Sequence, residues 1–440
     1  MKLFLDITRI AYRLTGTTPT GIDRVEFAYA ERILRDEAYR DSVCVFTAPF
    51  FTGALRRDLM QNVLDRIELA WRVGMSAEDD RTYCELRSHL RTPIGPGAPS
   101  RRRFRDANRF KHLRTHLIYP LRDLARSPVR LARWRKRVSG EHPIYLNTSH
   151  NQLETPQRLA WAAAPQTRSA FFIHDTIPID YPEFVAPVSL GRHERRMETV
   201  SAMASLMIVN SATTQRHLEA HLSRSRLRVP PCVVVPLGVA QTFITVRDEQ
   251  LKSSPNEACG HPYFVSLSTI EPRKNLLFLF AVWRRLAERL GADTPRLVIA
   301  GQRGWENENI ADVLERSRDL APFLVEVSDL CDDALARLLA GARGLLQPSS
   351  IEGFGLPVVE GLTVGTPVIA SDIAAHREVA GGFADLIDPL DGPAWLRAIE
   401  ALTDLSTGTA DSRRRANADY VPLSWQGHVE RALAAIKEMA

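Results

Sequence analysis

Long apolar runs are missing from this sequence of 440 residues. Nothing in it approaches the uninterrupted stretch of about 18 apolar residues that marks a membrane-spanning helix. The first residues, MKLFLDITRIAYRLTG, carry Asp6, Arg9 and Arg13 within their apolar pattern and show no small-residue cleavage site. We therefore predict a first strand and loop there rather than a signal peptide, and a cytoplasmic location for the chain.

Cysteine is scarce as well. The five cysteines are far apart and never form a CxxC pair, which predicts reduced thiols and excludes a zinc knuckle. The phosphate-loop patterns GxxxxGKS and GxxxxGKT are absent, so ATP or GTP hydrolysis at such a loop is not expected. Gly353 and Gly355 lack the third glycine of a dinucleotide fingerprint, which argues against a nicotinamide enzyme.

Metal-binding patterns are sparse. His217 and His221 are four residues apart on a predicted helix, but no third ligand is evident, so surface histidines are predicted rather than a metal site. The pairs Asp79-Asp80 and Asp332-Asp333 are predicted to be solvated.

Positive charge is concentrated in one segment. Residues 101–137 contain fourteen Arg or Lys against two Asp, a balance of +12, so the rest of the chain sums to −7 within the total of +5. Apolar residues recur there at helical spacing, at Phe110, Leu113, Leu117, Leu121 and Leu124. The segment could lie on the anionic inner face of the cell membrane, or be a solvated insertion whose leucines pack on the host domain. Nucleic acid is not an expected partner, because no recognised binding motif accompanies these residues.

Short apolar runs alternate with helical patterns along the whole chain, which predicts an α/β protein with parallel sheets. The predicted strands of the first half are KLFLDI, VCVFTA, PIYLNT, SAFFIHD, SLMIVN and CVVVPL. Those of the second half are YFVSLS, RLVIAG, FLVEVS, GLLQPS, PVIASD and ADLIDP. The polar stretch VRDEQLKSSPNEACGHP between the two sets is predicted to be a linker.

These patterns predict two doubly wound, Rossmann-like domains with their junction near residues 238–260. The first is expected over residues 1–240, with the basic insertion at about 100–137. The second is expected over residues 258–422.

The most informative stretch is SSIEGFGLPVVEGLTVGTPVIASDI, residues 349–373. It predicts a strand, a glycine loop, a helix and a second strand, so the loop places backbone N–H groups beside a helix N-terminus, where phosphate binds well. Glu352 and Glu360 lie on either side of this loop. Either carboxylate alone would be an ordinary dipole partner or a solvated helix residue, but the pair around a glycine loop favours a functional site.

A second unusual feature is the pair Arg273-Lys274, directly before the amphipathic stretch that begins at Leu276. Cations are unfavourable at a helix N-terminus, by about 0.3–1 kcal/mol each. Both this helix and the one after Gly355 begin at the carboxyl ends of strands, where open α/β sheets bind ligands. Arg273 and Lys274 are therefore predicted to bind a diphosphate rather than to point into water.

At these residues the chain resembles retaining glycosyltransferases of family 4, which have the GT-B fold. Glu352 and Glu360 match the family's E-x7-E pattern, and EPRKN matches its Arg-Lys pair. The resemblance extends over about 150 residues of the second half, including HREVAGG. It is weaker in the first half, where TGIDRVEFAYA resembles the glycine loop and FIHDTIPIDYPE resembles the histidine motif. The closing PLSWQGHVERAL resembles the C-terminal crossing helix. The resemblance therefore implies two domains that face each other across a cleft, with residues 423–440 as a helix that crosses back to the first domain.

The resemblance implies a role for each matching residue. Arg273 and Lys274 would neutralise the leaving diphosphate in place of a metal ion, since the Asp-x-Asp clamp of other glycosyltransferases is absent. Glu352 and His174 would contact the donor sugar, and Glu360 the ribose. The remaining donor-binding positions would be Gly21, Gly301, Phe354, Gly355 and Leu356. No metal and no cofactor are implied, and the leaving phosphate would help to deprotonate the acceptor.

The implied activity is transfer of a hexose from a nucleotide-sugar donor to a glycan or lipid-linked acceptor in bacterial surface polysaccharide synthesis. The first-half motifs look most like mannosyltransferases, which favours GDP-mannose as donor. Three alternatives stay open: a different donor such as UDP-glucose, a synthase that uses a soluble sugar phosphate, and a catalytically silent nucleotide-sugar-binding scaffold at the membrane.

Overall fold

The computed structural model describes residues 1–12, 19–48, 51–94, 103–105, 127–137, 142–163, 167–252, 261–404, 406 and 408–439. The chain divides into two compact units. The first unit comprises Met1–Trp71, Asn108–Gly238 and Leu423–Ala440, and the second comprises Arg72–Ala107 and Val239–Pro422. The chain therefore passes from one unit to the other four times, whereas the predicted domain limits require only two passages.

The first unit is built on one sheet with the order β3-β2-β1-β5-β6-β7-β8. All neighbours are parallel except β2 and β3. The strands are β1 (Leu3–Asp6), β2 (Val43–Thr47), β3 (Thr52–Leu55), β5 (Ile144–Asn147), β6 (Arg168–Ile173), β7 (Leu206–Val209) and β8 (Cys232–Val234). The six strands predicted for this half are confirmed. Strand β3, with the sequence TGAL, was not predicted because it contains no apolar run.

Helices cover both faces of this sheet. The helices of this unit are α1 (Thr8–Tyr12), α2 (Gly21–Arg35), α3 (Arg57–Trp71), α7 (Ser127–Arg137), α8 (Ile177–Asp180), α9 (Ser189–Met203), α10 (Ala212–Arg224) and α19 (Trp425–Met439). Helix α2 begins at a capping box, in which Thr20 and Asp23 satisfy each other's backbone N–H groups. Ser211 caps α10 as predicted, because its side chain accepts a hydrogen bond from the N–H of Thr214 at 3.0 Å.

Much of the basic segment, residues 101–102 and 106–126, lies outside the described residues. Its last part is helix α7, which packs on the core of the first unit through Leu131 and Trp134. The ring of Trp134 meets that of Phe4 edge-on, with 4.4 Å between ring centroids. This end of the segment therefore behaves as an insertion that packs on its host domain, and its binding to a membrane stays a prediction.

The second unit contains a parallel sheet with the order β14-β13-β12-β9-β10-β11-β4. Its strands are β4 (Arg103–Phe104), β9 (Tyr263–Leu267), β10 (Arg296–Ala300), β11 (Leu324–Val327), β12 (Gly344–Gln347), β13 (Val368–Ser371) and β14 (Asp385–Ile387). The six strands predicted for the second half are confirmed. Most are buried along their whole length, as expected of a sheet with helices on both faces.

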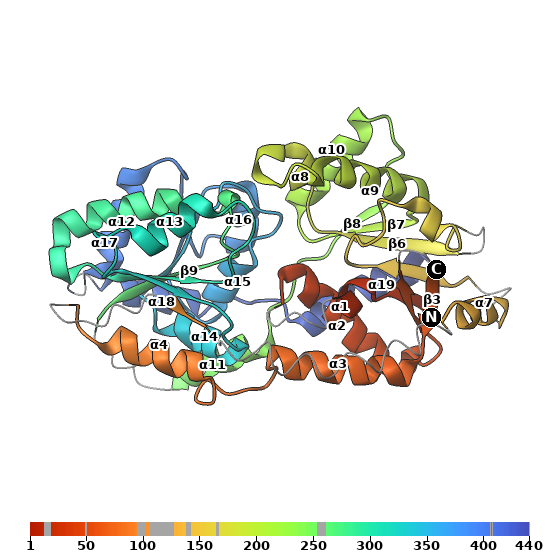
Figure 1. The fold of residues 1–440 in the computed structure, drawn as a ribbon, viewed down its shortest axis with the longest axis horizontal. Helices are drawn as coiled ribbons and strands as arrows, with labels where there is room; N and C mark the ends of the chain where they lie inside the picture. The colour runs from red at the N-terminus through yellow and green to blue at the C-terminus, as the bar shows by residue number, and fades with distance from the viewer. Residues whose placement is uncertain are drawn as a thin grey trace. The chain divides into compact units, whose positions relative to one another are not determined.

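The helices of the second unit form two layers. Its helices are α4 (Arg81–Arg91), α11 (Gln241–Lys252), α12 (Leu276–Leu290), α13 (Glu308–Arg316), α14 (Asp332–Gly341), α15 (Leu356–Thr363), α16 (Ala374–Ala380), α17 (Gly392–Thr403) and α18 (Thr409–Asn417). Figure 1 shows α12, α13 and α17 above β9, with α4, α11 and α14 below it. Helix α12 begins where predicted, and its apolar stripe, which includes Phe280 and Trp283, packs against the sheet.

The predicted linker VRDEQLKSSPNEACGHP is wrong in its first part. Helix α11 extends to Lys252 and packs against α14 of the second unit. Phe243 and Val246 are its buried residues, and a single apolar pair of this kind is too short a periodic signal to identify a helix. Residues 253–260 of the predicted linker lie outside the described residues.

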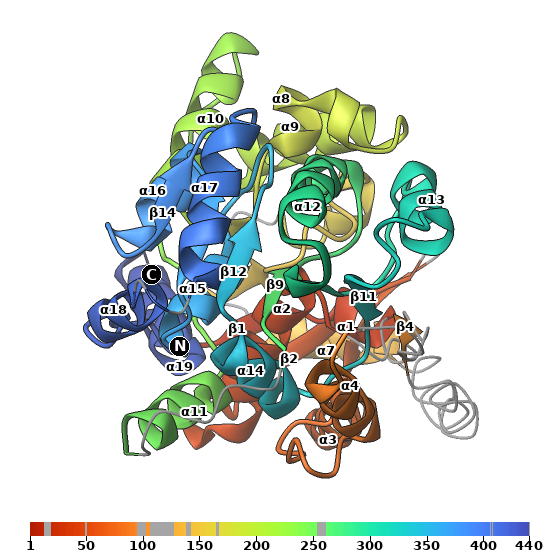
Figure 2. The ribbon, with the colours of Figure 1, turned by 90° about the vertical axis from the view of Figure 1, so that its left-hand side faces the viewer.

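An early segment of the chain completes the second sheet. Strand β4 lies at the edge of this sheet and pairs with β11 (Figure 2). In this pairing Phe104 lies opposite Val327. Phe104 is buried, and Arg103 forms an ion pair with Glu326 at 3.2 Å. The range 1–240 predicted for the first domain is therefore wrong for residues 72–107. Two residues of strand cannot be recognised from sequence, because they pair only with a partner more than 200 residues away.

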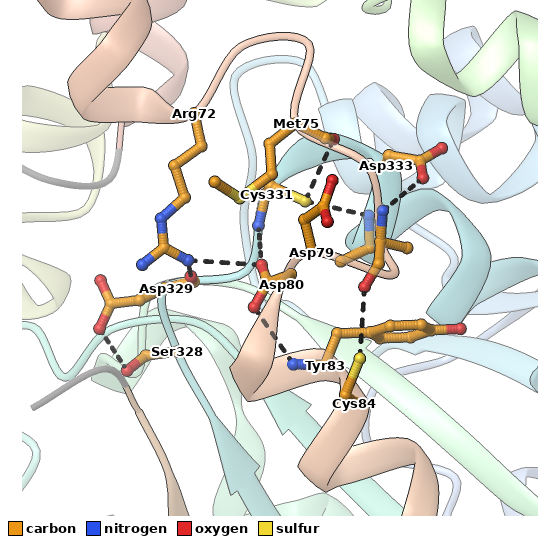
Figure 3. Close-up of polar contacts among 12 residues, drawn as sticks. Arg72, Met75, Asp79, Asp80, Tyr83, Cys84, Ser328, Asp329, Cys331 and Asp333 are labelled. Carbon is orange, nitrogen blue, oxygen red and sulfur yellow. Dashed lines mark hydrogen bonds and ion pairs between the residues drawn. The ribbon is translucent and has the colours of Figure 1, made fainter.

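A group of polar contacts holds the early segment that includes Ala77 and Asp80 against the loop before α14 (Figure 3). Asp80, which caps α4, accepts hydrogen bonds from the backbone N–H of Cys331 at 2.8 Å and of Tyr83 at 3.2 Å. Asp333 accepts a hydrogen bond from the backbone N–H of Ala77 at 2.8 Å. The prediction that the two Asp pairs are solvated is therefore wrong for Asp80, which is fully buried at this junction.

We expect Asp80→Ala to lower the free energy of unfolding of the second unit by about 2–4 kcal/mol. The substitution removes a helix cap, worth about 1 kcal/mol, and leaves a buried N–H without a partner, which costs about 1–3 kcal/mol. Urea unfolding followed by tryptophan fluorescence measures the loss. Asp79→Ala is the matched control, since Asp79 is exposed; equal midpoints for the two variants would contradict the role assigned to Asp80.

Among the helices that the structure describes, none combines the length and the apolar character needed to cross a membrane.

Candidate active site

The candidate site in the second unit lies where the strand order of its sheet reverses. After the early edge strand β4, the chain enters this sheet at β9, proceeds to β10 and β11 on one side, and later adds β12 on the other side of β9. Ligands of open α/β sheets bind outside the carboxyl ends of the strands at such a reversal. The loop after β9 carries Arg273 and Lys274, and the loop after β12 carries Glu352.

The structure brings these three side chains together. Arg273 Nη1 lies 2.7 Å from Glu352 Oε2, and Lys274 Nζ contacts Glu352 Oε1. Two further groups complete the cluster. Arg273 Nε lies 2.5 Å from Glu271 Oε1, and the Ser349 hydroxyl donates to Glu352 Oε1 at 2.8 Å.

Burial makes this cluster electrostatically strong. Lys274 and Glu352 are both more than nine-tenths buried. Burial alone would raise the pKa of Glu352, but the charges of Lys274 and Arg273 reverse this and hold the pKa well below its usual value. The pKa of Lys274 is lowered by burial and by Arg273, an effect that Glu352 and Glu271 oppose. The alternative that Arg273 and Lys274 simply point into water is therefore wrong for Lys274.

The formal charges of the cluster cancel, since two cations face Glu271 and Glu352. Attraction for an anion must therefore come partly from the backbone. Helix α15 begins beside Glu352, and its first N–H groups have no partner within the helix. Gly355 precedes this helix, with Phe354 and Leu356 on either side of it. The family resemblance implies that the backbone N–H groups of these three residues bind phosphate and sugar hydroxyls.

Gly355 has the backbone conformation that lets a phosphate approach the start of α15 closely. Its φ is 92°, which residues with a Cβ rarely adopt. A Cβ at Gly355 would also lie 2.9 Å from the ring of His376. His376 was not predicted as a site residue, although it falls within the HREVAGG motif. Its buried ring is oriented by a hydrogen bond between Nδ1 and the carbonyl oxygen of Ser371 at 2.9 Å.

Glu360 lies on α15 and is 6% exposed, so it is not the solvated helix residue of the simpler interpretation. Gly301 follows β10 with φ 150°. A Cβ at Gly301 would lie 1.9 Å from the carbonyl oxygen of Ser268, so its place in the fold alone accounts for a glycine. Contact of Glu360 with a ribose, and of Gly301 with a nucleotide, stay predictions.

In the first unit, His174 follows β6 and is buried. Its Nε2 lies 2.8 Å from the carbonyl oxygen of Thr148, and its backbone N–H donates to His150 Nε2 at 3.1 Å. Burial lowers the pKa of His174 to about 3, so the ring is neutral at neutral pH. Since Nε2 must then carry the proton that Thr148 accepts, Nδ1 is the ring atom left as an acceptor.

Gly21 is the first residue of α2, and nothing lies within 4 Å of where its Cβ would be. Open space there is compatible with the predicted neighbouring phosphate. The prediction of surface histidines at His217 and His221 is wrong for His221, which is buried, while His217 Nδ1 contacts Asp180 Oδ2 at 3.1 Å. No cluster of metal-ligating side chains occurs within the described part of the chain.

Solved structures share this architecture at low sequence identity. The chain aligns with Anabaena HepE in complex with UDP at a TM-score of 0.52 and 16% identity, covering 83% of this chain and 98% of that one. It aligns with sucrose-phosphate synthase from Thermosynechococcus elongatus at a TM-score of 0.53 and 18% identity, covering 74% and 79% of the two chains. The chain has the GT-B fold.

The second unit of this GT-B chain also matches a family model. Residues 261–404 match the model described as "Glycosyl transferases group 1". O-antigen chain mannosyltransferase B from Escherichia coli is 31% identical over 177 residues, which are 40% of this chain and 45% of that protein. MMP alpha-(1->4)-mannosyltransferase from Mycolicibacterium hassiacum is 36% identical over 213 residues, 47% and 48% of the two chains. The chain spans less than half the length of each of these relatives.

Proposed function

We propose that this GT-B protein is a retaining glycosyltransferase of family 4. It transfers a hexose, with mannose from GDP-mannose the preferred donor, to a glycan or lipid-linked acceptor in bacterial surface polysaccharide synthesis. The observation that carries the proposal is the Arg273–Lys274–Glu352 cluster at the strand reversal of the second sheet, in which Lys274 and Glu352 are buried. The similarity to mannosyltransferases over part of the chain supports the choice of sugar.

The chemistry of glycosyl transfer suits this cluster. Breaking the bond between sugar and phosphate builds negative charge on the diphosphate and positive charge on the sugar. Arg273 and Lys274, already held in place by carboxylates, would stabilise the departing diphosphate without reorganising. Preorganised donors of this kind are worth about 2.7–4 kcal/mol each in the transition state. Glu352 would face the sugar, where a carboxylate with a strongly lowered pKa stays ionised and can stabilise positive charge.

The donor can be identified by a thermal-shift titration with GDP, UDP and ADP in the presence of EDTA. We expect GDP to raise the melting temperature, because a ligand at 100 times its Kd stabilises the folded state by about 2.7 kcal/mol. The shift should vanish in the Arg273→Ala/Lys274→Ala variant. Stabilisation by UDP alone would replace GDP-mannose with a UDP-sugar, and a shift that survives in the variant would contradict the site.

A catalytically silent scaffold is the alternative to separate from this proposal. Glu352→Ala does so, since turnover of the donor should be lost in an enzyme, whereas a scaffold would retain its biological role. EDTA in the same assay tests metal independence, because turnover that requires a divalent cation would contradict the role given to Arg273 and Lys274.

A further inference from the structure

A fully buried carboxyl group lies at the strand reversal of the first sheet. It belongs to the TGIDRVEFAYA stretch, but to a position for which the family resemblance implies no role. Glu26 projects from α2, and its Oε1 accepts a hydrogen bond from the backbone N–H of Ile10 at 3.0 Å. The Ser149 hydroxyl is also buried and lowers the pKa of Glu26 by hydrogen bonding. Yet neither Glu26 Oε2 nor Ser149 Oγ has a fully formed hydrogen bond among the described residues.

The charges around Glu26 disfavour its ionised form. Burial and the neighbouring carboxylate of Asp6, at the end of β1, raise the pKa of Glu26 to about 8, while Arg9 of α1 and the two hydrogen-bonding groups lower it. Two groups on other strands also lie within electrostatic reach, the thiol of Cys44 on β2 and the hydroxyl of Tyr145 on β5.

Burial raises the pKa of Asp6 as well, but hydrogen bonds from Thr8 and Tyr145 oppose this shift. Asp6 Oδ1 accepts the backbone N–H of Thr8 at 2.9 Å, and its Oδ2 accepts the hydroxyl of Tyr145 at 2.7 Å. Two donors therefore support the negative charge of Asp6, whereas Glu26 has one backbone donor and a free oxygen. A protonated Glu26 can donate from Oε2 to Ser149 Oγ, which an ionised Glu26 cannot do.

Ser149 belongs to the tight loop on which His174 rests. Asn147 Oδ1 accepts the backbone N–H groups of Ser149 at 3.2 Å and of His150 at 3.1 Å. His150 is held at φ 63°, an unfavourable conformation for a residue with a Cβ. Thr148, between them, offers the carbonyl oxygen that receives His174 Nε2 at 2.8 Å. A displacement of Ser149 would therefore move the support of His174.

We propose that Glu26 is a positioning residue that acts as a neutral carboxylic acid. It joins the segment after β1, through Ile10, to the loop after β5, through Ser149, and so fixes the carbonyl oxygen that orients the His174 ring. The importance of this orientation for turnover rests on the proposed function, but the protonation of Glu26 and its hold on the loop do not.

The first test measures protonation and needs no turnover. We compare the melting temperatures of wild type and Glu26→Gln between pH 5 and pH 9. Above about pH 4.5 the unfolded chain releases the Glu26 proton while the folded protein keeps it up to about pH 8, so wild-type stability falls with rising pH. Glutamine does not titrate, so the melting temperature of the variant should rise relative to that of wild type from pH 5 to pH 8. Above pH 8 the difference between the two melting temperatures should stay constant. Glu37→Gln, at an exposed position, should show no such trend; a pH-independent difference for Glu26→Gln would overturn the proposal.

The second test measures whether Glu26 stabilises the loop of residues 147–152. Hydrogen exchange of the segment 147–152, corrected for the intrinsic rate, should be unchanged in Glu26→Gln at pH 7 and faster in Glu26→Ala. At pH 9 exchange should become faster in wild type but not in Glu26→Gln, because only wild type loses the donor. Equal exchange in all three proteins at both pH values would show that Glu26 does not position the loop.

The third test connects the loop to turnover of GDP-mannose. Glu26→Ala should lower kcat by about tenfold to a hundredfold, the size expected for a small misplacement of a contact residue, and Glu26→Gln should restore most of it. The wild-type rate should decline above about pH 8, and this decline should be absent in Glu26→Gln. An unchanged alkaline decline would overturn the proposal. A wild type with no turnover and no nucleotide binding would instead overturn the proposed function, and the first two tests would still decide the role of Glu26.

Discussion

Lys274→Met is expected to destabilise the second unit at neutral pH and to abolish binding of the nucleotide diphosphate. Methionine fills a similar volume, but it leaves the buried carboxylate of Glu352 with Arg273 as its only remaining cationic partner in the cluster. Removing one member of a buried ion pair costs about 3–5 kcal/mol, because the remaining charge stays desolvated. We expect about 3 kcal/mol, at the lower end, since Arg273 still contacts Glu352.

The pH dependence of this loss has a definite sign. In wild type the lowered pKa of Glu352 contributes stability above the unfolded value of about 4.5, and this contribution is lost as the pH falls toward the folded value. Without Lys274 the pKa of Glu352 should rise. The stability difference between variant and wild type should therefore be largest near pH 7 and smaller at pH 4, as urea unfolding at both pH values would show.

The double variant Lys274→Met/Glu352→Gln separates stability from function. Neutralising both partners removes the unpaired buried charge, so most of the lost stability should return, while diphosphate binding should remain absent. A single Lys274→Met variant as stable as wild type would mean that Glu352 does not depend on Lys274. Recovery of nucleotide binding in the double variant would mean that Lys274 does not bind the diphosphate.

Gly301→Ala is expected to lower the stability of the second unit by about 4 kcal/mol, combining backbone strain with overpacking. The Cβ of alanine would lie 1.9 Å from the carbonyl oxygen of Ser268, at a φ of 150°. The backbone cannot easily move to relieve this contact. The N–H of Ser268 donates to the carbonyl oxygen of Ala300 at 3.0 Å, and the N–H of Gly301 donates to the carbonyl oxygen of Val327 at 2.8 Å. Soluble yield and the urea midpoint measure the effect.

Gly21→Ala is the matched control for Gly301→Ala. Nothing lies within 4 Å of its Cβ position, so the free energy of unfolding should change by no more than about 0.5 kcal/mol. If a phosphate approaches Gly21 as predicted, nucleotide affinity should fall while stability is kept. Two variants with equal losses of stability would contradict this distinction between a glycine required by the fold and one required by a ligand.

The predictable part of the fold is the part encoded by local patterns. The twelve predicted strands were identifiable because buried parallel strands are runs of Val, Ile, Leu and Phe, and α12 because its apolar stripe repeats at helical spacing. Strand β4 and helix α11 were missed because their identity depends on distant partners, β11 and α14. The burial of Asp80 was missed for the same reason, since its partner Cys331 is 251 residues away.

The candidate site shows the same division. Arg273, Lys274, Glu352 and the glycine loop were identifiable because their residue types and spacing express a chemical requirement. That Glu352 lies directly against Arg273 and Lys274 was not identifiable, because it depends on β9 and β12 being neighbours in the sheet. Glu26 lies within the TGIDRVEFAYA stretch, but only its burial beside Asp6 distinguishes it from an ordinary helix glutamate.

Strand β4 has a consequence for how the polypeptide is made. During synthesis β4 leaves the ribosome long before β11, the strand that it must pair with. Domains usually fold as they emerge, from the N-terminal end, but the first unit here is interrupted by a segment that belongs to the second. Closing so long a loop slows folding more than it reduces stability. Until β11 is made, Arg103 and Phe104 have no strand to pair with, so the edge of the second sheet can be completed only late in synthesis.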